Sequence, residues 1–264
     1  MENKMNTKSV VTTALFVAVA LVIRNFSINI AAGGILTMRI SFAAIFYVLP
    51  GFLFGPLYGG IAGGLVDVLG YIMAPMGGYI PLLTITNIVA GALPALLWKL
   101  IKNSDVNKVK KFYRIFFIVM FLVGVINFLS IEFIPDTLWG KLLMMTGKRA
   151  QYFGVGFIIA ASIGLLLFFV INTLNKKGGI SYKYINGRYF KFVIVLGISG
   201  VIVSTLNTYI LLIFTPALMT KGFMVLWIPR MFQTIFITLI DSYIVCLLVY
   251  YYNLVEKKIV QKVQ

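Results

Sequence analysis

Residues 57–75 read LYGGIAGGLVDVLGYIMAP, and this stretch decides the class of fold. It is close to the length of about 20 mainly apolar residues that a membrane-spanning helix needs, yet it contains Asp67. A charged side chain at the bilayer centre costs about 2.5–3.5 kcal/mol on insertion scales, so it persists where it faces a partner or a cavity. A row of glycines, 55, 59 and 63, leads to Asp67 and lets a neighbouring helix approach closely. The stretch therefore predicts a tightly packed membrane helix beside a polar site.

The rest of the chain has the composition of a membrane protein. Its 264 residues are 61% hydrophobic and 11% charged, a balance that ordinary soluble domains do not have. The predicted fold class is all-α, a multi-pass transmembrane helical bundle. Apolar runs predict helices at 9–27, 39–54, 57–75, 82–101, 113–134, 152–174, 191–214 and 226–252.

Basic residues indicate the topology. The net charge is +16, but most of the 23 lysines and arginines lie in short segments between apolar runs. Cytoplasmic loops are enriched in these residues, so we expect a cell-membrane protein with both termini in the cytoplasm. The pattern is typical of topology signals and contacts with the lipid bilayer, not of a nucleic-acid-binding groove.

Two basic connections, 102–112 and 175–190, enclose a pair of predicted helices. We read residues 1–264 as a single membrane domain. Its core covers 9–101 and 191–252, and a helical hairpin of about 102–190 is inserted into it.

Residues that carry most enzymatic and metal chemistry are scarce. The chain has no histidine, and its single cysteine, Cys246, lies in the last apolar run. A zinc or haem site is therefore not expected, and neither is a disulfide. There is no phosphate-binding loop and no paired nucleophile and base. We predict a protein that is not an enzyme and needs no cofactor.

Polar residues of several helices fall at a similar depth in the outer half of the membrane. We expect them to form a pocket that is open to the outside, beneath flexible connections at 31–34 and 75–79. Asp241, deeper in the last helix, is predicted to be structural. The predicted substrate-binding residues are Arg39, Asp67, Tyr71, Thr84, Asn87, Asn207, Thr208, Arg230 and Gln233.

Each of these residues also has a plain structural interpretation. Arg39 and Arg230 could extend to lipid headgroups. Asp67 could pair with one of these arginines without touching a ligand. Asn207 and Thr208 could hold helices together through interhelical hydrogen bonds.

A set of short motifs resembles a known family. The motifs are Leu36-Thr37-Met38-Arg39-Ile40-Ser41-Phe42, Leu53-Phe54-Gly55-Pro56, Gly59, Gly63, Asp67 and Gly70, with Leu206-Asn207-Thr208 and Ile228-Pro229-Arg230 later in the chain. Together they are similar to the substrate-binding S-components of energy-coupling factor (ECF) vitamin transporters, and most similar to the folate-type branch. The resemblance covers about 9–101 and 191–252.

The resemblance implies a six-helix protein that captures a vitamin from outside the cell. Such a protein docks on a transmembrane coupling protein that is attached to two ATPase subunits. The family's Ala-x-x-x-Ala contact with the coupling protein matches Ala14 and Ala18. Residues 102–190 have no counterpart in this scheme.

The expected substrate is folate or a related anionic vitamin. The glutamate tail of folate would suit Arg39 or Arg230, and the hydrogen-bond donors of its pterin would suit Asp67. Biotin and pantothenate are also anionic, so an S-component for another vitamin stays open. A stand-alone secondary transporter is a further alternative, although the paired discontinuous helices typical of that design are missing from the sequence. The last alternative is an intramembrane enzyme, or an accessory protein whose polar faces only hold helices together.

Overall fold

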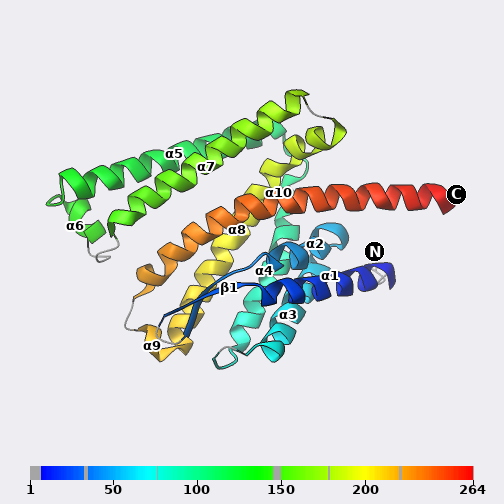
Figure 1. The fold of residues 1–264 in the computed structure, drawn as a ribbon, viewed down its shortest axis with the longest axis horizontal. Coiled ribbons are helices and arrows are strands. Elements are labelled where there is room, and N and C mark those ends of the chain that lie inside the picture. The colour runs from blue at the N-terminus through cyan, green and yellow to red at the C-terminus, as the bar shows by residue number, and fades with distance from the viewer. Residues whose placement is uncertain are drawn as a thin grey trace. The chain divides into compact units, whose positions relative to one another are not determined.

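The structure is a computed structural model, and it describes residues 7–32, 35–75, 77–144, 150–177, 179–219 and 222–263 (Figure 1). Contacts within the chain divide it into two compact units. The first unit contains Met1–Asn103 and Lys191–Gln264, and the second contains Ser104–Phe190. The helix α8 (Ile180–Phe214) begins in the second unit and ends in the first.

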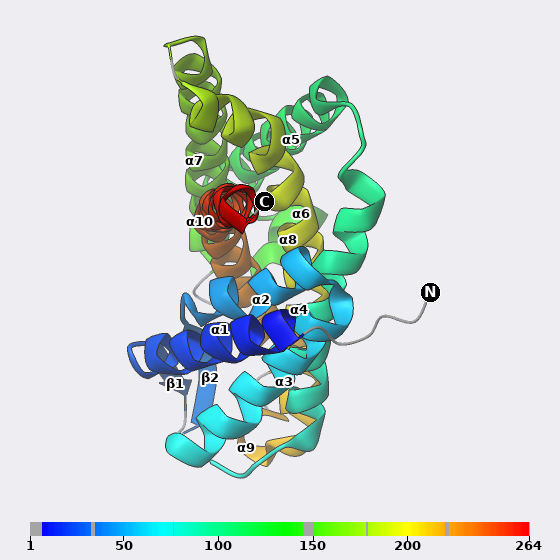
Figure 2. The same cartoon turned by 90° about the vertical axis from the view of Figure 1, so that its right-hand side faces the viewer.

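The elements of the first unit come from both ends of the chain. They are α1 (Thr7–Asn25), β1 (Ile28–Ala32), β2 (Ile35–Ile40), α2 (Ala43–Phe54), α3 (Pro56–Met73), α4 (Pro81–Ile101), the later part of α8, α9 (Pro216–Met219) and α10 (Phe223–Val263). Figure 2 shows α1 lying against α2 and α3, and α1 packs on both of these helices. A small apolar core with Val17, Ala20, Ala62 and Val66 joins α1 and α3.

The membrane character of the chain is confirmed by the length and composition of its helices. Within the described residues, seven helices are long and apolar enough to cross a bilayer. The shorter α2 is apolar too, but its 12 residues extend only about 18 Å, less than the roughly 30 Å of a hydrocarbon core. The multi-pass helical bundle predicted from the sequence is therefore correct, and so is its short second helix.

Glycines bring α2, α3 and α4 into backbone contact. A Cβ atom built on Gly59 would overlap the carbonyl oxygen of Gly91, and one on Gly63 would overlap that of Asn87. Gly51 is also close, because its Cβ atom would lie 2.9 Å from the Gly91 oxygen. The predicted close approach of helices is confirmed at Gly59 and Gly63, whereas a Cβ atom on Gly55 would meet nothing within 4 Å. This packing holds Asp67 and Asn87 on adjacent helices.

The segment before α2 differs from the prediction. Residues 28–40 form an antiparallel hairpin in which Ile28 pairs with Ile40 and Asn29 with Arg39. Ser41 Oγ then accepts a hydrogen bond of 3.2 Å from the N–H of Ala43, where α2 begins. The predicted helix start at 39 is wrong, because the isoleucine-rich stretch on either side of the turn favours strands. Arg39 thus lies on a strand. Gly33, Gly34 and Met76 of the two predicted lids lie outside the described residues.

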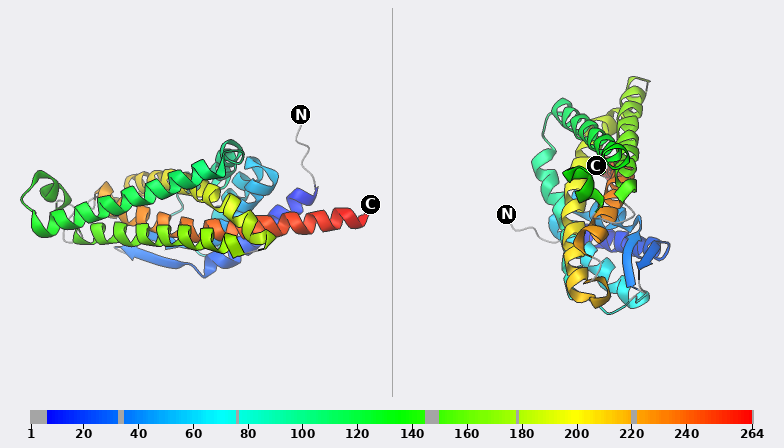
Figure 3. Two further views of the ribbon diagram at one scale, coloured as in Figure 1. Left: turned by 90° about the horizontal axis from the view of Figure 1, so that it is seen from above. Right: turned by 90° about the vertical axis from the view of Figure 1, so that its left-hand side faces the viewer.

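The second unit is a helical hairpin. It contains α5 (Val106–Phe133), α6 (Leu138–Met144), α7 (Ala150–Lys177) and the first turns of α8. Helices α5 and α7 run side by side in Figures 1 and 3, with Gly124 of α5 and Gly154 of α7 in close contact. Helix α5 begins earlier than predicted, since Asp105 Oδ1 caps it by accepting a 3.0 Å bond from the N–H of Asn107.

Candidate functional site

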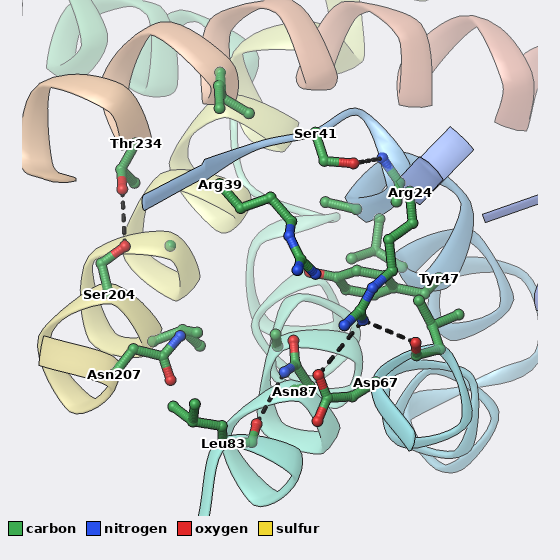
Figure 4. A pocket seen from close by; sticks show the side chains of 18 of the residues that line it. Arg24, Arg39, Ser41, Tyr47, Asp67, Leu83, Asn87, Ser204, Asn207 and Thr234 are labelled. Atoms are coloured by element: carbon green, nitrogen blue, oxygen red, sulfur yellow. Dashed lines mark hydrogen bonds and ion pairs between the residues drawn. The ribbon is translucent and has the colours of Figure 1, made fainter. Parts of the chain in front are cut away.

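A cavity of about 420 Å³ lies within the first unit (Figure 4). Its walls come from α1, β2, α2, α3, α4, α8 and α10, together with the connection after α3. The structure brings seven of the nine predicted binding residues to this cavity. They are Arg39, Asp67, Tyr71, Asn87, Asn207, Arg230 and Gln233. Thr84 and Thr208 are not on the wall but bond to residues that are.

Asp67 has a partner that the sequence analysis did not identify. Arg24, at the end of α1, places Nη1 3.4 Å from Asp67 Oδ1 and donates a 2.8 Å bond to the carbonyl of Val66. On the other side, Thr84 Oγ1 donates to Asp67 Oδ2 at 2.7 Å. Both carboxylate oxygens are thus engaged, and Figure 4 shows Arg24 and Asp67 facing each other at the cavity.

Gly70 makes room for Arg24. A Cβ atom on Gly70 would lie 2.5 Å from Arg24 Nε and 2.6 Å from Cδ. Arg24 therefore packs directly over the backbone of α3. In the sequence, the only signal for this role was a single arginine in the last turn of an apolar helix.

Two tyrosines stand above this network, at the connection between α3 and α4. The rings of Tyr71 and Tyr79 are 5.0 Å apart at an angle of 49°. Tyr71 donates through its hydroxyl to the carbonyl of Gly77 at 3.0 Å, and Tyr79 Oη lies 2.6 Å from Thr84 Oγ1. The connection is thereby tied to the Asp67 carboxylate through Thr84.

On the facing wall, α4 and α8 meet through polar side chains. Thr86 of α4 is buried, and its hydroxyl bonds to Asn207 Oδ1. Asn87 donates through Nδ2 to the carbonyl of Leu83 at 2.9 Å, one turn earlier in its own helix. Thr86 was missed in the sequence, where it is one of many threonines in apolar runs.

Arg230 is held by α8. Its Nη1 donates to Thr208 Oγ1 at 3.2 Å, and Thr208 in turn donates to the carbonyl of Ser204 at 2.7 Å. The Thr208 side chain is fully buried, whereas Arg230 lines the cavity with 9% of its surface exposed. Thr208 therefore orients Arg230 and does not form part of the wall.

Gln233 connects α10 to the hairpin. Its Nε2 donates a 2.6 Å bond to the backbone carbonyl of Arg39 on β2. Figure 4 shows the side chains of Arg39 and Arg24 extending toward one another over the cavity. Burial lowers the pKa of Arg39, and the positive charge of Arg24 lowers it further, while Asp67 opposes the shift. The two guanidinium groups are thus close enough to interact electrostatically.

Three arginines and two aspartates line the cavity. Asp67 balances Arg24, and Asp241 offsets one of the two remaining arginine charges, so the five groups leave a net surplus of one positive charge. Asp241, which we expected to be structural, is the second aspartate on the wall. No group of three or more histidine, cysteine, aspartate or glutamate side chains that could hold a metal occurs within the described residues.

Comparison with known proteins gives two matches. The family model for the S component of the ECF-type riboflavin transporter matches residues 4–146, more than half of the chain. The folate transporter FolT of Clostridium novyi (strain NT) is 31% identical over 126 residues, which are 48% of this chain and 65% of that protein. The match thus spans slightly less than two thirds of the relative. No solved structure matches the chain.

Proposed function

Because this chain belongs to the S-component family of ECF-type riboflavin transporters, we propose that it is the substrate-binding subunit of an ATP-driven vitamin importer. We further propose that its substrate is folate or a related anionic vitamin. The observation that carries this proposal is the net positive charge of a cavity of about 420 Å³, in which Arg39 and Arg230 are not paired with Asp67. That volume lies in the range of about 300–1,000 Å³ that is typical of small-molecule sites.

The charge distribution supports an anionic substrate over a neutral one. An arginine presents a planar fork that matches a carboxylate, and the bonds between them are among the strongest hydrogen bonds in proteins. Folate has a dicarboxylate tail, whereas riboflavin has no carboxylate. The FolT relative supports the same choice. The family match supports riboflavin as the second candidate.

The proposed binding residues have unequal roles. Arg39, Tyr71, Asn87, Asn207, Arg230 and Gln233 would contact the substrate from the cavity wall. Asp67 would act through Arg24, Thr84 through Asp67 and Thr208 through Arg230, because their hydrogen bonds run to those residues.

The coupling surface is proposed on α1. Ala14 and Ala18 are exposed, while Thr13, Val17 and Ala20 of the same helix are buried against the bundle. Small exposed residues four positions apart allow another helix to pack closely. We propose that a transmembrane coupling protein with two ATPase subunits docks on this face.

We also propose how the chain is oriented in the membrane. Both termini lie in the cytoplasm, and the cavity opens to the outside. The second unit is an insertion into a six-helix core and keeps the orientation of the helices on either side of it.

A ligand panel tests the proposed substrate. The purified chain is titrated with folic acid, riboflavin, biotin and pantothenate, and dissociation constants are measured by calorimetry. We expect folic acid to bind most tightly. The Arg230→Ala variant should bind it about 10- to 100-fold more weakly, the loss expected for a buried charged hydrogen bond.

The matched control is Arg188→Ala, which removes an exposed arginine of the second unit. It should leave the affinity unchanged. Preferential binding of riboflavin would favour the second candidate. Equal folic acid affinity in wild type and Arg230→Ala would remove Arg230 from the site.

A further inference from the structure

Asp241 carries a carboxylate oxygen without a partner. Its side chain lines the cavity and is only 6% exposed. Within the described residues, no hydrogen bond reaches its buried Oδ1 atom. Both oxygens of Asp67, by contrast, are engaged. A buried carboxylate oxygen without a donor is unfavourable, so a donor that arrives with a ligand would satisfy it.

Asp241 and Arg230 lie far apart on the same face of α10. The residues of α10 that line the cavity are Arg230, Gln233, Thr234, Ile237, Thr238 and Asp241. A helix rises about 1.5 Å per residue, so the eleven positions from Arg230 to Asp241 span roughly 16 Å. A ligand that reaches both residues must therefore be elongated, with an anionic end and an end that donates hydrogen bonds.

A second acceptor on the wall comes from α4. Pro94 lies inside this helix and lines the cavity, as does Ala90. Proline has no N–H, so it cannot donate the helical bond that the Ala90 carbonyl would otherwise receive. The Ala90 carbonyl therefore lacks its usual helical donor, and Oδ1 of Asp241 lacks a donor as well.

A structural role for Asp241 fits the contacts less well. An aspartate that holds helices together needs a donor on a neighbouring helix. Two arginines of the cavity wall are directed elsewhere, Arg24 to Asp67 and Arg230 to Thr208. The cavity wall also includes apolar residues such as Val48 and Leu196, which suit the faces of a flat ring.

We propose that Asp241 selects the heterocycle of the substrate by accepting hydrogen bonds from adjacent N–H groups on the ring edge, while the arginines hold a carboxylate at the other end. This inference rests on the proposed function and specifies its substrate class: an elongated carboxylate with an aminopyrimidinone-type ring. Folate has both ends. Riboflavin lacks the carboxylate, and biotin and pantothenate lack the aminopyrimidinone-type ring.

The test divides the ligand into its two ends. The full chain and Asp241→Asn are titrated with folic acid, with pteroic acid, which keeps the pterin, and with p-aminobenzoylglutamic acid, which keeps the glutamate. We expect Asp241→Asn to bind both pterin compounds about 10- to 100-fold more weakly. Its affinity for p-aminobenzoylglutamic acid should stay within twofold of wild type. Asp136→Asn, the same change at an exposed position, should leave all affinities unchanged.

The melting temperature separates recognition from a structural role. Ligand-free Asp241→Asn should melt at the same temperature as wild type or higher, because the substitution removes a buried negative charge whose Oδ1 atom has no donor. A lower melting temperature together with equal loss of all three ligands would overturn the assignment. So would unchanged affinity for folic acid in the variant, and in that case the proposed function would stand. If the wild-type chain does not bind folic acid, both the proposed function and the role of Asp241 are overturned.

Discussion

Arg24 at the end of α1 and Asp67 on α3 form an ion pair of 3.4 Å in which each side chain is only 14% exposed. The same guanidinium nitrogen bonds to the carbonyl of Val66, and Gly70 leaves space for the side chain to lie against α3. The charge of Asp67 is therefore compensated from within the first unit, by a helix that begins near the N-terminus. This pair links the helix proposed for coupling to the wall of the cavity.

The ion pair predicts a coupled loss of stability. Asp67→Asn should lower stability by about 1–3 kcal/mol, because it leaves the Arg24 charge shielded from water without its counter-ion. Arg24→Met should have a similar effect, and the double variant should lose less than the sum of the two. The stability of all three variants is measured as the apparent melting temperature in detergent. Strict additivity would mean that the pair contributes nothing.

Gly70→Ala tests the packing of Arg24. The added Cβ atom would lie 2.5 Å from Arg24 Nε, so the side chain must move away from Asp67. We expect a lower melting temperature in the wild-type background and almost no change in an Arg24→Met background. Gly187→Ala is the control, because it is helical and has open space around the new atom. An equal effect of Gly70→Ala in both backgrounds would contradict the contact.

Helices could be predicted from the sequence, but their ends could not. Hydropathy marks the part of a helix that lies in lipid, and α8 and α10 continue beyond it into basic residues. Helix α8 begins at Ile180, although 175–190 was predicted as a connection. The hairpin of β1 and β2 was missed because a short apolar run can form a helix or strands equally well.

Some cavity residues could be predicted from the sequence, and others could not. Asp67, Asn207 and Arg230 could be identified because polar side chains in apolar runs are rare and expensive. Arg24 was missed because its role depends on Gly70 and Asp67, more than forty residues away in the sequence. Asp241 was predicted to be structural from its depth, and its unpartnered oxygen becomes evident only when the neighbouring helices are in place.

Thr208→Val separates orientation of Arg230 from direct contact with the substrate. Valine keeps the shape of the fully buried Thr208 side chain but removes the hydroxyl that accepts from Arg230. Loss of one such bond is worth about 1 kcal/mol, so folic acid should bind roughly fivefold more weakly, a smaller loss than in Arg230→Ala. The control is Thr173→Val in α7, where the hydroxyl also bonds to the carbonyl one turn earlier. Unchanged affinity in Thr208→Val would show that Arg230 does not need this partner.

Enlarging the exposed alanines of α1 should block transport without affecting binding. Ala14→Trp and Ala18→Trp point away from the buried residues Thr13 and Val17, so the isolated chain should keep its folic acid affinity and melting temperature. In liposomes that contain the coupling protein and both ATPases, ATP-driven uptake should fall at least tenfold, because a large side chain prevents close helix packing.

Leu166→Trp on the exposed face of α7 is the control for added surface bulk and should leave uptake intact. Liposomes without the coupling module should show no uptake with any variant. If they accumulate folic acid, the chain transports alone and the proposed partnership is wrong. If uptake with the module is unchanged in both α1 variants, docking uses another face. A parallel loss of binding would instead place the alanines in the fold of the site, since only separate effects on binding and uptake identify a coupling surface.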